Sequence, residues 1–134
     1  MSDLLNCSIE IHDSFLNSVE SEGTVLKLFV EAYIHKSKGT PGVDPGTVWV
    51  QNVILMIENG SFEGYANAFP YDLSDGTLQV DGKCTRNVIP IPLEAKGQVI
   101  LMLLDKRSGK NMIARGTRIS LKLLGEPEYV EQFQ

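Results

Sequence analysis

The stretch Thr117-Arg-Ile-Ser-Leu-Lys-Leu123 alternates polar and apolar side chains. Alternation with a period of two places one face of a β-strand on a core and the other face in water. The dipeptides Asp75-Gly76 and Asp81-Gly82 favour tight hairpin turns, because both central positions of such turns need a positive φ. Almost no helical periodicity separates these signals, so the sequence predicts an antiparallel all-β chain.

Three further segments should form strands that contact the core. Thr24–His35 has one wholly apolar face, made of Leu26, Leu28, Val30, Ala32 and Ile34. Thr47–Ile57 and Gln98–Asp105 are apolar on both faces, as strands covered on both sides are. About nine strands with two such central strands fit an antiparallel two-sheet sandwich, and a flattened β-barrel is the alternative.

Proline and glycine mark the connections. Lys36–Gly46 contains two Pro-Gly pairs and is long for a hairpin, so it is either a functional loop or a crossover between sheets. Two prolines make Val88–Leu93 an edge strand or a connector. Pro127 is expected to end the last strand, leaving Glu128–Gln134 as a short helical turn or a frayed end.

Length and composition predict one folded domain. The chain has 134 residues, of which 43% are hydrophobic and 22% charged, and we expect a single domain over residues 1–134. Cys7 and Cys84 are too few for a disulfide framework and are expected to be buried free thiols. No signal peptide is visible, and the longest apolar run, Val99–Leu104, is too short to span a bilayer. We therefore expect a cytoplasmic protein without membrane contact.

The charges are unevenly distributed along the chain. Residues 1–82 contain 3 Lys or Arg and 12 Asp or Glu, whereas residues 83–122 contain 9 and 2. Such asymmetry marks either a basic patch for an anionic partner or basic strands that pair with acidic ones. We favour the second interpretation. Nucleic acid is not an expected partner, because the net charge is −5 and no recognition helix is predicted.

His12-Asp13-Ser14 has the residue types of a catalytic triad. A triad is defined by geometry, and neighbouring strand residues point to opposite faces, so His12 and Asp13 would not orient one another in a regular strand. The favoured interpretation is a strand end at which Asp13 and Ser14 satisfy backbone groups through their side chains.

His12 and His35 are predicted to share a face, because each lies opposite the apolar face of its own strand and the two strands should pair. With Glu10, Glu31 or Asp44 nearby they could bind zinc, iron or nickel, which accept imidazole and carboxylate ligands. The sequence contains no His-x-His or Cys-x-x-Cys motif to support such a site.

A row of aromatic residues is the second candidate site. Tyr65, Asn67, Phe69 and Tyr71 share one parity of a predicted strand. On an open sheet face these rings and the amide could stack a sugar or a base. The alternative, which we favour, is that the row belongs to the core, since large aromatic side chains are usually well buried.

The opening stretch Ile9-Glu-Ile-His-Asp-Ser-Phe-Leu-Asn-Ser-Val19 resembles the start of small, uncharacterised bacterial β-rich domains. These domains open with a His-Asp-Ser strand end followed by an apolar-patterned strand, and similar openings occur among immunity proteins of toxin systems. The resemblance implies a bacterial cytoplasmic protein of unknown function. It implies no activity, cofactor or site residue.

Three functions remain open from the sequence. The favoured one is a non-enzymatic binding or protein-interaction module, expected as a homodimer formed through a sheet face or edge. The second is a carbohydrate or small-ligand binder that uses the aromatic row. The third is a metal-dependent enzyme at His12 and His35. We assign no catalytic residue and no cofactor.

Overall fold

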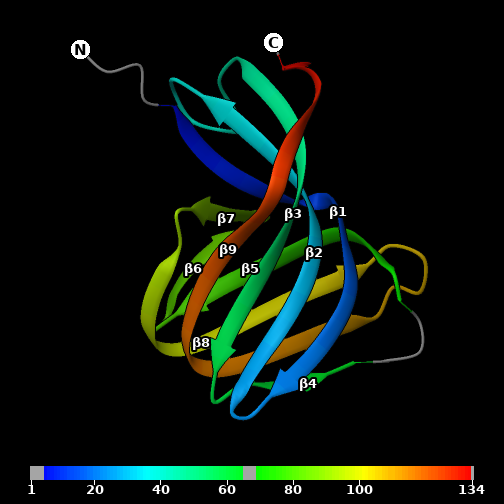
Figure 1. Ribbon diagram of the computed structural model, residues 1–134, viewed down its shortest axis with the longest axis vertical. Helices are drawn as coiled ribbons and strands as arrows, with labels where there is room; N and C mark the ends of the chain where they lie inside the picture. The colour runs from blue at the N-terminus through cyan, green and yellow to red at the C-terminus, as the bar shows by residue number, and fades with distance from the viewer. Residues whose placement is uncertain (1–4, 65–68, 134) are drawn as a thin grey trace.

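Nine β-strands make up the described part of the chain. The computed structural model describes residues 5–64 and 69–133. The strands are β1 (Asn6–Glu22), β2 (Val25–Ser37), β3 (Gly46–Glu58), β4 (Ser61–Glu63), β5 (Tyr71–Val80), β6 (Lys83–Arg86), β7 (Val88–Ile91), β8 (Glu94–Asp105) and β9 (Asn111–Phe133). Figure 1 shows the start of β1 and the end of β9 at the same end of the molecule. Within these residues there is no helix long and apolar enough to cross a membrane.

The strands pair antiparallel in a single sheet. Its order is β6-β5-β8-β9-β3-β2-β1-β7, and β4 pairs with β9. β1 also pairs with β5, where Phe15 and Leu16 lie opposite Asp72 and Tyr71, and this closes a ring of β1, β2, β3, β9, β8 and β5. The prediction of an antiparallel all-β chain is confirmed. The predicted division into two sheets is not, because all described strands belong to one sheet.

The interior of the ring is filled by the apolar faces that the alternation predicted. The apolar face of β2 is buried throughout, at Leu26, Leu28, Val30, Ala32 and Ile34. β8 contributes Val99, Leu101 and Leu103, and Ile119 of β9 is fully buried. Full burial of a large aliphatic side chain stabilises a fold by about 1.5–3 kcal/mol, so these faces provide the main stabilising term.

Four strands continue beyond the ring as an open sheet, which we call the extension. It consists of residues 6–10 of β1, 33–37 of β2, 46–50 of β3 and 128–133 of β9, and β7 pairs with its β1 edge at residues 7–10. Figure 1 shows it rising above the ring. Its inner face continues the ring interior. The loop 38–45 folds over its outer face, where Gly42 lies against the carboxylate of Glu10.

Only one of the two Asp-Gly dipeptides forms the predicted turn. Asp81 and Gly82 connect β5 to β6 with φ values of 49° and 83°, the positive values that a tight hairpin needs. Asp75-Gly76 lies inside β5, so the predicted turn there is wrong. A Cβ on Gly76 would lie 2.5 Å from the carbonyl oxygen of Met102, so the glycine instead permits close packing of β8.

The expectation that Pro127 ends the last strand is also wrong. β9 runs on to Phe133, which lies opposite Gly46. The register shifts opposite Gln51, whose Nε2 donates to the carbonyl oxygen of Gly125 at 3.0 Å. β8 pairs with β9 only as far as Ser120, so along this part β9 has a described partner strand on one side only. A proline is tolerated at such an edge because no neighbouring strand needs its missing N–H.

Basic and acidic segments pair with each other, in agreement with the favoured interpretation of the charge asymmetry. Arg115 forms an ion pair with Glu63 at 2.6 Å, and Arg86 forms one with Asp75 at 3.0 Å. Arg118 contacts the carboxylates of both Glu58 and Glu94. Exposed pairs of this kind each stabilise a fold by about 0–1 kcal/mol, so they orient strands more than they stabilise them.

The two cysteines differ in exposure. Cys7 is a half-buried free thiol on β1 that packs against the core. Cys84 is exposed on the edge strand β6, so the expectation that it is buried is wrong. A strand as short as β6 at the edge of a sheet has only one neighbour to cover it.

Candidate functional site

β1 is distorted at His12-Asp13-Ser14, next to the extension. Asp13 has a φ of 74°, and the pairing with β2 shifts register between Glu10 and Phe15. Ser14 is fully buried. Its hydroxyl donates to the carbonyl oxygen of Glu10 at 2.7 Å and accepts from the backbone N–H of Tyr33 at 2.9 Å. Ser14 therefore satisfies backbone groups that the distortion leaves unpaired, as the sequence predicts, and it is not placed as a nucleophile.

The ring of His12 is oriented by Asn87. The amide oxygen of Asn87 accepts from the backbone N–H of His12 at 2.8 Å, which fixes the amide so that its nitrogen faces His12 Nδ1. Nδ1 then acts as the acceptor, and the proton of the neutral ring resides on Nε2. Nε2 lies 3.5 Å from Glu10 Oε2 and 3.4 Å from Asp13 Oδ2. We call His12, Glu10, Asp13, Ser14 and His35 the polar cluster. His12 is about half exposed and lies on its solvent side.

His35 lies on the other side of the same carboxylate. Its Nδ1 is 3.5 Å from Glu10 Oε1, and its ring centre is 4.5 Å from that of Phe133 in an edge-to-face arrangement. The side chain is completely buried, and neither ring nitrogen has a hydrogen-bond partner among the described residues. A buried polar group without a partner destabilises the folded state by about 1–3 kcal/mol, so His35 lowers the free energy of unfolding of this chain.

The structure thus brings His12 and His35 together on Glu10, as their shared face predicted. The other two carboxylates suggested from the sequence do not join them, because Glu31 is exposed on β2 and Asp44 accepts from the backbone of Thr40 within the loop 38–45. Across residues 5–64 and 69–133, no group of three or more His, Cys, Asp or Glu side chains is placed to hold a metal ion. The metal hypothesis therefore lacks a set of ligands in this part of the chain.

Tyr33 adds a hydroxyl to the cluster. It donates to Glu131 Oε1 at 3.1 Å, which ties β2 to the end of β9. Burial, then the hydrogen bond to Glu131 and the negative charges of Glu131, Asp13 and Glu10, raise the pKa of Tyr33 to about 12. The hydroxyl is therefore protonated and acts as a donor at neutral pH. Its hydrogen bond to Glu131 connects β2 to the end of β9 on the outer face of the extension.

Replacing His35 with leucine should stabilise the protein. The substitution removes an imidazole that is buried without a hydrogen-bond partner, and we expect the free energy of unfolding in urea at pH 7.5 to rise by about 1–2 kcal/mol. His12→Leu is the matched control, because it removes a partly exposed ring that Asn87 orients, and it should not stabilise. A loss of stability in His35→Leu would show instead that His35 is held as a charged partner of Glu10.

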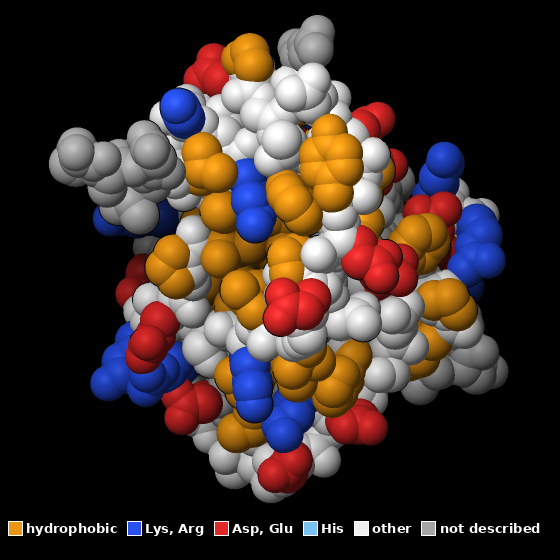
Figure 2. Space-filling model, turned by 45° about the horizontal axis from the view of Figure 1, so that its top comes forward, with side chains coloured by type: hydrophobic (Ala, Val, Ile, Leu, Met, Phe, Trp, Pro, Cys, Tyr) orange, Lys and Arg blue, Asp and Glu red, His pale blue; other side chains and the backbone are white. Residues whose placement is uncertain are grey.

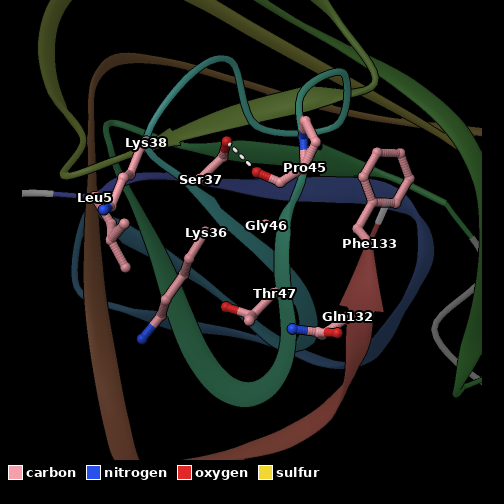
Figure 3. A pocket seen from close by; sticks show the side chains of 9 residues that line it. All are labelled: Leu5, Lys36, Ser37, Lys38, Pro45, Gly46, Thr47, Gln132 and Phe133. Carbon is pink, nitrogen blue, oxygen red and sulfur yellow. Dashed lines mark hydrogen bonds between the residues drawn. The ribbon is translucent and has the colours of Figure 1, made fainter.

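An open pocket of about 600 Å³ lies at the tip of the extension, and we call it the open-end pocket. Figure 3 labels its lining residues, which come from the end of β2, the start of β3, the end of β9, the loop 38–45 and Leu5, the residue before β1. Apolar contact surface comes from Leu5, Pro45 and Phe133. Lys36 and Lys38 contribute two cations, and none of the lining residues in the described part of the chain is acidic.

The inner face of the extension adjoins this pocket. Trp49 lies opposite Tyr129, and their rings are 5.3 Å apart in an edge-to-face arrangement. The indole Nε1 of Trp49 donates to Thr47 Oγ1 at 2.8 Å, and Lys36 Nζ lies 4.8 Å from the centre of the Trp49 ring. Figure 2 shows hydrophobic side chains gathered on this end of the molecule, with positive and negative side chains among and beside them.

The aromatic row predicted from the sequence does not form an open platform in the described residues. Tyr65 and Asn67 lie outside them. Tyr71 is buried in the core, and Phe69 packs against it with the ring centres 4.9 Å apart. The favoured interpretation, that the row belongs to the core, agrees with the positions of these two rings.

No family model, curated protein or solved structure matches the chain. The candidate site therefore rests on geometry alone. Sequence reasoning missed the open-end pocket, although one signal for it was available. Trp49 is the only tryptophan of the chain. It lies with Thr47 and Val48 at the start of a predicted strand, directly after the loop Lys36–Gly46. A large aromatic side chain near a strand end is a common element of binding surfaces.

Proposed function

We propose that the protein is a non-enzymatic binding module that takes its ligand into the open-end pocket. The observation that supports this is the position of the exposed large hydrophobic side chains. Of the five among the described residues, four lie at the extension or in the adjoining segments, and these are Leu5, Val43, Tyr129 and Val130. The fifth, Leu123, lies further down β9. Leu5 lines the open-end pocket, and the other three lie in the loop 38–45 or the end of β9, which supply further lining residues. Exposed apolar side chains concentrated at one end of a molecule mark a binding site.

The polar cluster supports binding over catalysis. His35 is sealed from solvent, and the hydroxyl of Ser14 is engaged by two backbone groups. A general acid or base has to reach its substrate directly or through one water, so His35 cannot act as one. The half-exposed His12 lacks a nucleophile among the described residues, because the Ser14 hydroxyl beside it is buried and engaged. The open-end pocket, by contrast, is accessible, and its volume falls in the range of about 300–1,000 Å³ that small-molecule sites occupy.

A neutral fluorescent probe tests this proposal without assuming the ligand. We expect N-phenyl-1-naphthylamine to bind the full chain with increased fluorescence, and Leu5→Ser to weaken that binding about fivefold, because half-burying a leucine contributes on the order of 1 kcal/mol. Leu123→Ser is the matched control, since Leu123 is 47% exposed and Leu5 44%, but Leu123 does not line the pocket.

Two outcomes would contradict the proposal. One is an absence of probe binding, and the other is an equal loss in both serine variants. A second copy of the chain is the competing occupant of this apolar end. Sedimentation equilibrium distinguishes it, because a concentration-dependent dimer that excludes the probe would show that the surface is an interface between copies.

A further inference from the structure

We infer that the ligand of the open-end pocket is a small amphipathic carboxylate, an inference that rests on the proposed function. The charge of the lining is the first observation. The chain has a net charge of −5, yet the described residues that line the pocket include Lys36 and Lys38 and no Asp or Glu. Neither lysine forms an ion pair with any described residue. A concave surface with two cations that no described residue neutralises attracts an anion.

The geometry around Lys36 is the second observation. Its Nζ lies over the Trp49 ring, an arrangement that positions a cation without neutralising it. Thr47 lies opposite Lys36 on the next strand, and its Oγ1 accepts from the Trp49 indole N–H. Accepting this bond uses a lone pair of the Thr47 hydroxyl and not its O–H group, which can still donate to a ligand. Figure 3 shows Lys36 and Thr47 next to each other at the pocket.

These two donors suit the two oxygens of one carboxylate. An ammonium N–H can bind one oxygen and a hydroxyl O–H the other, and hydrogen bonds to an ionised acceptor are about twice as strong as neutral ones. Lys38 adds long-range attraction at the rim of the pocket. The donor pair therefore specifies a monoanion with a planar, two-oxygen headgroup.

The apolar lining specifies the rest of the ligand. Leu5 and Pro45 line the same pocket. Phe133 also lines it, and its ring packs against His35 on the covered outer face. An apolar body next to the carboxylate would cover surface that is otherwise exposed, including the 44% exposed side chain of Leu5. A purely polar anion would leave this surface in water, so the lining favours an acyl or aryl carboxylate.

Decanoate tests the inference against two ligands of the same chain length. Trp49, the only tryptophan, reports binding by its fluorescence because Lys36 and Thr47 both contact it. In titrations below the micellar range, we expect decanoate to bind at least about tenfold more tightly than 1-decanol, and decyltrimethylammonium to bind most weakly. The preference for decanoate should decrease with added salt, because screening weakens exposed charge interactions.

Lysine variants locate the carboxylate. Lys36→Met and Lys38→Met should each weaken decanoate binding about fivefold, and Lys36→Arg should retain decanoate binding. Lys122→Met is the control, because Lys122 is exposed on β9 and does not line the pocket.

The outcomes separate this inference from the proposed function. If the neutral probe binds but decanoate binds no better than 1-decanol, the carboxylate inference is overturned and the binding module stands. If decanoate is preferred but neither lysine variant weakens it, the anion binds elsewhere and the inference is again overturned. If the neutral probe itself fails to bind, the proposed function fails.

Discussion

Tyr71→Ala should reduce the free energy of unfolding by about 3–5 kcal/mol, a large part of the total stability of a domain this size. Tyr71 is 3% exposed and lies opposite the fully buried Leu16, at the pairing of β1 with β5 that closes the ring. Its ring also packs edge-to-face against Phe69. Truncation would leave a cavity at the point of closure, where the surrounding strands cannot collapse without losing the pairing. Urea unfolding at pH 7 measures the loss.

Tyr129→Ala is the matched control for this experiment. Tyr129 is 53% exposed and lies at the end of β9, so its truncation should reduce the free energy of unfolding by less than about 1 kcal/mol. The comparison also tests the sequence-based hypothesis that Tyr71 binds a sugar or base. Equal losses in the two variants would mean that Tyr71 is not part of the core, and that hypothesis would regain support.

The fold was predictable where local pattern and burial agree. The alternation from Leu26 to Ile34 identifies the buried face of β2 because every second side chain faces the ring interior. The Asp75-Gly76 dipeptide wrongly predicted a turn. The glycine there allows the backbone of β8 to pack closely against β5. Ring closure through Phe15 and Tyr71 could not be predicted, since nothing local in either segment specifies a partner so far away in the chain.

The candidate site was predictable only in part, for a similar reason. The parity of His12 and His35 correctly placed both histidines on one face, and Glu10 was among the carboxylates expected nearby. The open-end pocket was not predictable, because it forms where Leu5, Lys36 and Phe133 meet at the tips of three strands. Pro127 led to the wrong prediction that the last strand ends before Phe133, because a proline usually ends a strand unless that strand lies at the edge of a sheet.

Asp105→Asn should lower the free energy of unfolding at pH 7 by about 1–3 kcal/mol. Asp105 is 4% exposed at the end of β8. One carboxylate oxygen accepts from the backbone N–H of Asp72 at 3.1 Å, and the other accepts from that of Ser108 at 3.0 Å. Asparagine supplies a single carbonyl oxygen and turns an N–H group toward one of these donors. Glu63→Gln, an acid-to-amide change at an exposed ion pair, should have an effect below about 1 kcal/mol.

The effect of Asp105→Asn should decrease in acid, and its sign follows from the hydrogen bonds. Burial opposes ionisation, but the hydrogen bonds from Ser108 and Asp72 outweigh it and lower the pKa of Asp105 in the folded chain. A lowered pKa means that ionised Asp105 stabilises the fold at pH values above its unfolded pKa of about 3.9, and that this contribution is lost as the pH falls through the folded value. Asparagine does not titrate, so urea unfolding should show a constant difference between the two proteins from pH 7 to pH 5 and a smaller one below about pH 4. A difference that persists unchanged at pH 2.5 would mean that the carboxylate acts through its shape and packing, and not through its charge.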